Sequence, residues 1–326
     1  MQHRICFTGS HNAPEVKQAM ERYMQDRGFA LEMVTMKTRD AYEWKEDLAD
    51  YDIIISNGEK YDAGTIGYLS GKLKMISRCG LGYDEIDIEA AGKLGIPVTN
   101  CAGTMSDSVA ETALAFMLNL TRRYPEHNRN ILSGAWSDGK PGRQLAGKTV
   151  GFVGFGSIAR KLAQYLRGFG CELIACDSFW DEGRAAALGV RRCTLEEVAA
   201  DSDFVSLHVP ANAETKGMIN KGFLSTMKRS AYLINTARGP IVDEADLVDA
   251  LRLGSIAGAG LDVFENEPIG ADNPLLTMGN VFLTPHIASL AIEATIEAGE
   301  MACENALRFI EGKPLQTQVN RMYMEI

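Results

Sequence analysis

Glycines near the middle of the chain are spaced as they would be in a phosphate-binding turn. The run Gly154-Phe155-Gly156-Ser157-Ile158-Ala159 follows an apolar stretch, 149–153, and opens a helical pattern that ends at Gly170. Gly154 permits a tight turn, Gly156 lets a diphosphate approach the backbone, and the small Ala159 allows close packing of helix and strand. We expect the N–H groups of Phe155, Gly156, Ser157 and Ile158 to bind the diphosphate at the helix N-terminus.

An acidic residue follows the next apolar run. The stretch 172–176 is typical of a second strand and ends at Asp177. A carboxylate there accepts hydrogen bonds from ribose hydroxyls and repels a 2′-phosphate. Strand, glycine turn, helix, strand and acid in this order predict a dinucleotide site, with NAD preferred over NADP. The alternative is an ordinary strand–helix turn whose glycines serve packing alone.

Four later apolar runs continue the sheet, at 204–209, 231–235, 256–262 and 281–283. Polar residues and one proline lie at or just after their ends: Pro210, Thr236, Arg238, Asp262 and His286. Ligands of open parallel sheets bind beyond the carboxyl ends of the strands. We therefore expect these residues to lie near the bound dinucleotide.

The rest of the chain indicates a second α/β domain. Short apolar runs alternate with helical patterns over the first hundred residues, which is typical of a parallel sheet with helices on both faces. A pattern over 106–132 predicts one long helix that leads into the second domain, and 288–311 predicts a helix that returns to the first. The expected domains are 1–101 with 287–326, and 102–286.

Composition excludes several classes of function. The chain has 326 residues and a formal net charge of −10, which disfavours nonspecific binding to nucleic acid or to an anionic membrane. Its seven cysteines form no CxxC pair, so we expect neither a metal site nor a disulfide framework. The first residues contain no apolar signal segment, which favours the cytoplasm.

Six ordered motifs resemble the D-isomer-specific 2-hydroxyacid dehydrogenase family. They are 78–84 (RCGLGYD), 109–111 (VAE), 154–158 (GFGSI), 235–239 (NTARG), 262–268 (DVFENEP) and 285–289 (PHIAS). The resemblance implies an α/β fold with two doubly wound parallel-sheet domains, in which a Rossmann NAD-binding domain is inserted into a flavodoxin-like catalytic domain. It also implies a homodimer with the active site in the cleft between the domains, acting on a small 2-oxo or 2-hydroxy acid.

The resemblance assigns catalytic roles to Arg238, Glu267 and His286. A histidine can deliver a proton near neutral pH, and Glu267 would raise its pKa by stabilising the imidazolium. Arg238 can hold a carboxylate with a fixed charge and two donors. Taken singly, the three would be a structural loop histidine, a solvated acid and a surface cation.

Further contacts are expected from position in the chain. Val209 and Pro210 would cover the adenine side of the cofactor, with Thr215 close behind them. Thr236 and Ala237 would pass under the nicotinamide ribose. Asp262 would accept a hydrogen bond from the N–H of the nicotinamide carboxamide. Thr104 would approach the phosphates or the nicotinamide. The expected substrate contacts, through backbone N–H groups of the first domain, are Asn57, Gly58, Cys79 and Gly80; for Cys79 a buried packing role is an equal alternative.

The substrate is the least determined feature. Phosphoglycerate-type relatives carry Arg-Ser after the strand equivalent to 52–56, whereas this chain has Asn57 and Gly58, and Glu59 is expected to repel a phosphate; Lys60 partly offsets this. We therefore favour glyoxylate or hydroxypyruvate, with D-3-phosphoglycerate dehydrogenase as the alternative. Oxidation of formate or phosphite, and an NAD(H)-sensing corepressor-like binding protein, remain rival hypotheses.

Overall fold

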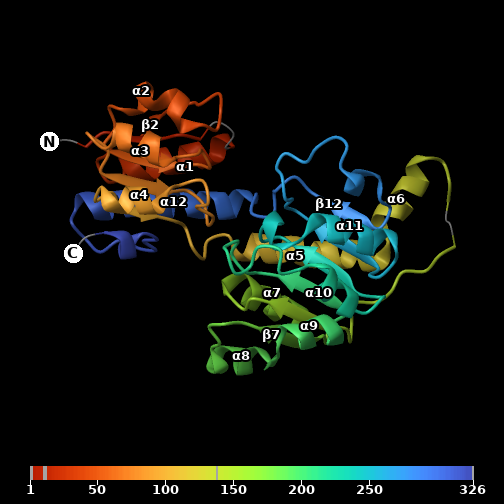
Figure 1. The fold of residues 1–326 in the computed structure, drawn as a ribbon. Coiled ribbons are helices and arrows are strands. Elements are labelled where there is room, and N and C mark those ends of the chain that lie inside the picture. Colours follow the sequence, from red (N-terminus) through yellow and green to blue (C-terminus); the bar gives the residue numbers. More distant parts are fainter. Residues whose placement is uncertain (1–2, 10–12, 137–138, 325–326) are drawn as a thin grey trace. The chain divides into compact units, whose positions relative to one another are not determined.

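The computed structural model describes residues 3–9, 13–136 and 139–324. It divides into two compact units, drawn in Figure 1. The first unit runs to Met105 and resumes at Leu290, and the second is Ser106–Ser289. The sequence predicted domain boundaries after residues 101 and 286, a few residues before the boundaries in the structure.

The first unit has one five-stranded parallel sheet in the order β2-β1-β3-β4-β5. This is the order of flavodoxin-like folds, as expected. Its strands are β1 (Ile5–Phe7), β2 (Glu32–Met33), β3 (Ile53–Ser56), β4 (Met75–Arg78) and β5 (Val98–Thr99). Its helices are α1 (Pro14–Gln25), η1 (Ala41–Trp44), α2 (Lys45–Leu48), α3 (Ala63–Leu69), α4 (Ile88–Lys93), α12 (Ile292–Ile310) and η4 (Arg321–Tyr323).

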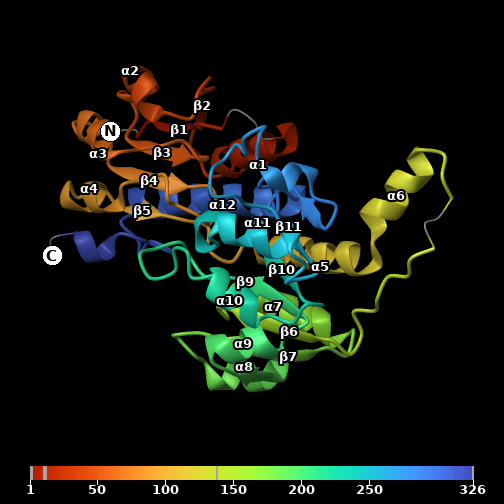
Figure 2. The ribbon, with the colours of Figure 1, turned by 45° about the vertical axis from the view of Figure 1, so that its right-hand side comes forward.

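The helix α12 packs against α1 and the strands β3 and β4, and Figure 2 shows it alongside them. Small residues line its buried face, which lets it approach closely. A Cβ atom added at Gly299 would lie 2.7 Å from Cγ of Met20 on α1. The hydroxyl of Ser77 on β4 donates to the Ala302 carbonyl at 2.9 Å. These contacts attach the end of the chain to the first unit.

The second unit has a seven-stranded parallel sheet in the order β12-β11-β10-β9-β6-β7-β8. The order reverses between β6 and β9, which is the switch point where Rossmann-type sheets bind their ligands. Its strands are β6 (Thr149–Val153), β7 (Glu172–Cys176), β8 (Val190–Arg192), β9 (Phe204–Leu207), β10 (Tyr232–Asn235), β11 (Gly258–Leu261) and β12 (Val281–Leu283). The two-domain parallel-sheet fold predicted from the sequence is therefore confirmed.

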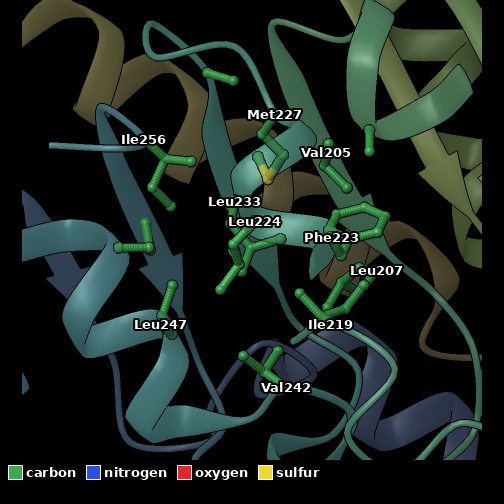
Figure 3. Close-up of a cluster of buried hydrophobic side chains, with 14 of the residues drawn as sticks. Val205, Leu207, Ile219, Phe223, Leu224, Met227, Leu233, Val242, Leu247 and Ile256 are labelled. Atoms are coloured by element: carbon green, nitrogen blue, oxygen red, sulfur yellow. The ribbon is translucent and has the colours of Figure 1, made fainter. Parts of the chain in front are cut away.

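Helices cover both faces of this sheet. They are α5 (Ser106–Arg122), α6 (Tyr124–Leu132), α7 (Ser157–Arg167), α8 (Glu182–Leu188), α9 (Leu195–Asp201), α10 (Lys221–Thr226), η2 (Gly239–Ile241), α11 (Glu244–Arg252) and η3 (Pro274–Thr277). On one face α5 and α7 bury apolar residues against the strands. On the other face α9, α10 and α11 do so, and Figure 3 shows side chains such as Phe223, Leu224 and Leu247 around Leu233. Each such side chain, fully buried, contributes about 1.5–3 kcal/mol.

The single helix predicted over 106–132 is wrong, because the structure breaks it into α5 and α6. Arg123, between them, has a φ of 57°, in the left-handed region. Pro125 has no N–H to donate to the carbonyl of Thr121, as a continuous helix would require. Arg143 N donates to that carbonyl instead, at 2.7 Å. In the described part of the chain, no helix combines the length and apolarity needed to cross a membrane.

Candidate active site

The turn between β6 and α7 needs glycine at its first position. Gly154 has a φ of 88°, and a Cβ atom there would lie 2.7 Å from the carbonyl oxygen of His208, just after β9. Any side chain would therefore push apart the two strand ends at the switch point. The expected tight turn is present for this reason.

The N-terminus of α7 is open. Gly156 is its N-cap, and no side chain caps the helix. A Cβ atom added at Gly156 would meet nothing within 4 Å, so the backbone can be approached closely from that side. The N–H groups of Ser157 and Ile158 lie in the first turn, where a helix favours an anion. The turn thus has the shape and polarity that a diphosphate requires.

One expected donor is used elsewhere. The Phe155 N–H donates to the Asp177 carboxylate at 2.6 Å, so it is not available to a diphosphate, contrary to the expectation from sequence. The Phe155 ring is buried and stacks on Trp180 at 5.8 Å, which holds this residue close to the end of β7. The diphosphate donors are therefore to be sought from Gly156 onward.

Asp177 lies at the end of β7, where a ribose is expected. Its two carboxylate oxygens accept from the N–H groups of Phe155 and Phe179, each at 2.6 Å. Each oxygen keeps a second lone pair for a hydroxyl. Arg184, the first arginine after it, is paired with Asp181 at 3.1 Å. These contacts fix the carboxylate in place and fit NAD better than NADP.

Among the other residues expected at the cofactor, two threonine hydroxyls have hydrogen-bond partners and a third has none in the described part of the chain. The hydroxyl of Thr215 donates to the Pro210 carbonyl at 2.6 Å and so holds the loop that begins at Val209. The hydroxyl of Thr104, in the first unit, donates to the Cys101 carbonyl at 2.9 Å. Thr236 differs, because its buried hydroxyl finds no partner among the described residues. A ribose hydroxyl would satisfy that group.

His286 and Glu267 form a close ion pair after β12 and β11. Nδ1 of His286 lies 2.7 Å from the Glu267 carboxylate, whose other oxygen accepts from the Phe264 N–H at 3.0 Å. The hydrogen bond to Glu267 raises the pKa of His286. Burial acts to raise the pKa of Glu267, but the bonds from His286 and Phe264 outweigh it and the pKa is lowered. Nε2 of His286 has no partner in the described part of the chain, so it can exchange a proton with a ligand.

The backbone at His286 is held in an unusual conformation by Asp262. The φ of His286 is 53°, and its N–H donates to the Asp262 carbonyl at 2.7 Å. The fully buried Asp262 carboxylate accepts from the Thr284 hydroxyl at 2.5 Å and from the N–H groups of Ile287 and Ala288 at 2.8 Å. The side chain expected to accept from a carboxamide is thus also the anchor of the histidine loop.

Arg238 is set in place by its neighbours in the turn after β10. The buried Asn235 side chain donates to the Arg238 carbonyl at 2.9 Å and accepts from the Ala237 N–H at 3.0 Å. A Cβ atom at Gly239 would lie 1.8 Å from the Phe264 carbonyl oxygen, so only glycine lets this turn approach the Glu267 loop. The charge of Arg238 is felt by both His286 and Glu267. The structure therefore brings the three expected catalytic residues together.

The expected substrate contacts in the first unit need correction. The N–H groups of Cys79 and Gly80 donate to the carbonyls of Ser56 and Arg78, at 2.8 and 3.0 Å, so neither is available to a carboxylate. The Cys79 thiol is buried, which raises its pKa and fits a packing role. The N–H groups of Leu81 and Gly82 make no hydrogen bond to described residues. The sequence reasoning did not single out these two N–H groups, which follow Gly80 directly.

Asn57 and Gly58 follow β3, with Gly58 at a φ of 98°. The sequence analysis expected Glu59 to repel a phosphate, but its side chain does not face solvent. It is only 5% exposed, and its carboxylate accepts from the Thr8 hydroxyl and the Asn57 N–H, both at 2.8 Å. Burial raises the pKa of Glu59, which favours its neutral form. The buried position of Glu59 therefore weakens the electrostatic argument against a phosphate.

Other chemistries find less support. Burial lowers the pKa of His208 to about 3, so it is a poor proton carrier at neutral pH. Among the described residues no group of His, Cys, Asp and Glu could hold a metal ion. An open helix terminus, an acid at the end of β7 and a Thr236 hydroxyl without a partner among the described residues together fit a dinucleotide. The neighbouring ion pair and arginine fit proton transfer to an anionic substrate.

Comparison with known proteins agrees with this geometry. The family model described as D-isomer specific 2-hydroxyacid dehydrogenase, NAD binding domain, matches residues 114–288. A D-3-phosphoglycerate dehydrogenase of Archaeoglobus fulgidus is 38% identical over 91% of this chain, and a glyoxylate reductase of Korarchaeum cryptofilum is 41% identical over 78%. The chain spans 56% of the length of the former and 78% of the latter.

Solved structures are similar over nearly the whole chain. A protein from Thermus thermophilus matches with a TM-score of 0.87 and 32% identity, over 97% of this chain and 99% of its own. A glyoxylate reductase from Paecilomyes thermophila matches with a TM-score of 0.86 and 28% identity, over 99% of this chain and 100% of its own. The family model identifies NAD as the ligand of the second unit.

Proposed function

Because the chain belongs to the D-isomer specific 2-hydroxyacid dehydrogenase family of NAD-dependent oxidoreductases, we propose that it transfers a hydride between NAD and a small D-2-hydroxy acid/2-oxo acid pair. The observation that carries this is the His286–Glu267 pair at 2.7 Å, with the charge of Arg238 acting on both. A histidine whose pKa is raised by a neighbouring carboxylate is typical of a proton carrier in catalysis.

The proposed mechanism assigns one task to each residue. The bound nicotinamide supplies the hydride for reduction. His286 gives its proton from Nε2 to the substrate's carbonyl oxygen, and Glu267 keeps the imidazole protonated for this by raising its pKa. Arg238 holds the substrate carboxylate and polarises the carbonyl. In oxidation the neutral imidazole takes the proton back.

The N–H groups of Leu81 and Gly82 and the loop at Asn57 and Gly58 are proposed to contact the substrate from the first unit. We favour glyoxylate or hydroxypyruvate, because two glyoxylate reductases match at 41% identity over 78% of this chain. D-3-phosphoglycerate is the second candidate, since a phosphoglycerate dehydrogenase matches 91% of this chain.

A steady-state assay with NADH tests the proposal. Purified protein is given glyoxylate, hydroxypyruvate, pyruvate and 3-phosphohydroxypyruvate. We expect kcat/KM for glyoxylate or hydroxypyruvate to exceed that for 3-phosphohydroxypyruvate at least about tenfold, a difference of roughly 1.4 kcal/mol in transition-state stabilisation. The reverse order would identify the phosphorylated substrate. NADH binding without turnover of any 2-oxo acid would favour the NAD(H)-sensing alternative.

Two further properties belong to the proposal. We propose a homodimer, which light scattering on the purified protein would test against a monomer. We propose a cytoplasmic location, supported by seven cysteines that are all free thiols. Cell fractionation would test it.

A further inference from the structure

A hollow of about 340 Å³ lies within the first unit, at the amino end of β5. Its walls come from the residues before β5, the end of α12 and the segment that follows α12. The loops proposed to contact the substrate follow the carboxyl ends of β3 and β4 in the same parallel sheet. Amino and carboxyl ends of parallel strands lie at opposite edges of a sheet, so the hollow is not part of the proposed substrate site.

Hydrogen bonds hold the last described segment against β5. The N–H of Val319 donates to the Val98 carbonyl at 2.9 Å, and the Val98 N–H donates to the side-chain oxygen of Asn320, also at 2.9 Å. The side-chain nitrogen of this buried asparagine donates to the Ile96 carbonyl at 2.9 Å. Figure 2 shows the segment, in dark blue, beside β5 and α4. The position of the next residue, Arg321, is thereby fixed.

The wall on the side of α12 is held in the same way. The side-chain oxygen of Asn305, on α12, accepts from the Gln316 N–H at 2.8 Å. Nε of Arg308 donates to the Pro314 carbonyl at 2.7 Å. These two bonds lie on either side of Leu315, which lines the hollow. Because the walls are fixed before a ligand arrives, binding costs little ordering of the chain.

The lining combines apolar side chains with one cation. Pro97, Phe309, Leu315 and Met324 supply the apolar surface, and Arg321 supplies the charge. No described residue accepts a hydrogen bond from the Arg321 guanidinium or forms an ion pair with it. Small-molecule sites have volumes of about 300–1,000 Å³ and place a few polar groups in a mostly apolar lining. The hollow fits the small end of that range.

Neighbouring acids do not compete for this cation. Glu89 on α4 is paired with Lys93 at 2.6 Å, and Glu311 after α12 is paired with Lys313 at 2.6 Å. An anion from solution therefore meets an available guanidinium. Since the chain as a whole carries a formal net charge of −10, attraction of an anion must come from such a local cation.

Gln318 offers a second donor in the lining. Its Nε2 lies 2.9 Å from Sδ of Met324 and 3.4 Å from Oδ1 of Asn320. A thioether is a weak acceptor, and 3.4 Å is long for a hydrogen bond. A carboxylate in the hollow is a stronger acceptor than either, so it can take the Nε2 donor of Gln318 as well as those of Arg321.

We propose that this hollow is a binding site for a small monocarboxylate with an apolar body. Two parallel N–H donors of Arg321 match the two carboxylate oxygens, and the apolar body covers Phe309 and Leu315. A neutral analogue lacks the ion pair, and a carboxylate without an apolar body buries little surface, so both bind more weakly. The site goes beyond the proposed function and requires neither NAD nor turnover.

An NMR titration of the full chain tests this site directly. The protein carries ¹³C-methyl methionine, and the Met324 signal is assigned by its loss in Met324→Leu. Phenylacetate is the probe, with neutral phenylacetamide and the apolar-poor acetate as comparisons. We expect phenylacetate to shift the Met324 signal with a dissociation constant of about 1 mM or below. Phenylacetamide and acetate should each bind at least about tenfold more weakly.

Variants separate the charge from the apolar contact. Arg321→Met should weaken phenylacetate binding at least about tenfold and change phenylacetamide binding less than about threefold. Leu315→Ala should weaken both probes alike. The matched control Arg22→Met, at an exposed arginine of α1, should leave both unchanged. Arg321 is itself exposed, so its replacement is expected to leave the thermal melt unchanged.

Two results would overturn the proposal. One is a Met324 signal that phenylacetate does not move, including the case in which only other methionine signals shift because the probe binds elsewhere. The other is an equal affinity for phenylacetate in wild type and Arg321→Met, because the guanidinium would then have no part in binding.

Discussion

Asp262→Asn separates two roles that the sequence and the structure assign to the same side chain. The sequence places Asp262 against a carboxamide, whereas the structure gives its carboxylate three donors from the loop that carries His286. The asparagine keeps one oxygen, which can retain the bonds from Thr284 and Ile287. Its amide then faces the Ala288 N–H, so two donors oppose each other and one bond is lost.

The size of the effect follows from burial. Asp262 has no solvent exposure, so water cannot replace the lost acceptor. A buried donor left unpaired costs about 1–3 kcal/mol. For a unit of the size of Ser106–Ser289, each kcal/mol lowers the melting temperature by about 2–4 °C, which gives about 2–12 °C in total. A displacement of His286 by about 1 Å would lower kcat by up to about 100-fold.

The assay compares three quantities in wild type, Asp262→Asn and the exposed control Asp272→Asn. They are the melting temperature, kcat with the best 2-oxo acid, and the dissociation constant of NADH from fluorescence titration. We expect the melting temperature and kcat to fall in Asp262→Asn, with a smaller change in NADH affinity. Thr284→Val, which removes one donor and leaves the carboxylate in place, should have a weaker effect of the same kind.

Two outcomes would refute the reasoning. An unchanged melting temperature and kcat would show that the loop does not depend on the Asp262 carboxylate. Weaker NADH binding at unchanged stability and kcat would return Asp262 to the role of a cofactor contact.

Three further predictions concern the site. His286→Ala is expected to lower kcat by about 10²–10⁴-fold with little change in NADH affinity, and near-normal turnover would remove the mechanism. Glu267→Gln removes the partner that raises the pKa of His286. Neutral imidazole, the base in oxidation, then persists to lower pH, so the acidic limb of the kcat/KM profile should move to lower pH; an unmoved limb would contradict the pairing. Asp177→Ala should narrow the preference for NAD over NADP, measured as the ratio of kcat/KM, and an unchanged ratio would exclude its part in cofactor choice.

Local sequence patterns were enough to predict most of the fold. Buried parallel strands are continuous apolar runs, so β6, β7, β9 and β10 are visible without any knowledge of their partners. The short β8 was not predicted, because two of its three residues are exposed and leave no apolar run. The glycine turn and Asp177 could be predicted because turn geometry and the approach of a diphosphate constrain adjacent residues.

The three proposed catalytic residues could be predicted only from the motifs that contain them. Arg238, Glu267 and His286 were assigned by resemblance, and their roles remain predictions until variants are measured. No spacing in the sequence shows that Gly239 must lie against the Phe264 carbonyl, or that the Asp262 carboxylate bonds residues more than 20 positions later. Such contacts depend on which strands become neighbours in the sheet.

By itself, the sequence determined the kind of fold and the expected place of the dinucleotide, because both depend on apolar periodicity and on turn chemistry within short segments. Only the tertiary structure decided which groups are available to a substrate. It buried Glu59 and used the N–H groups of Cys79 and Gly80 in the backbone. The physical reason is that burial and hydrogen-bond occupancy are set by neighbours from distant segments, through the pairing register of the strands.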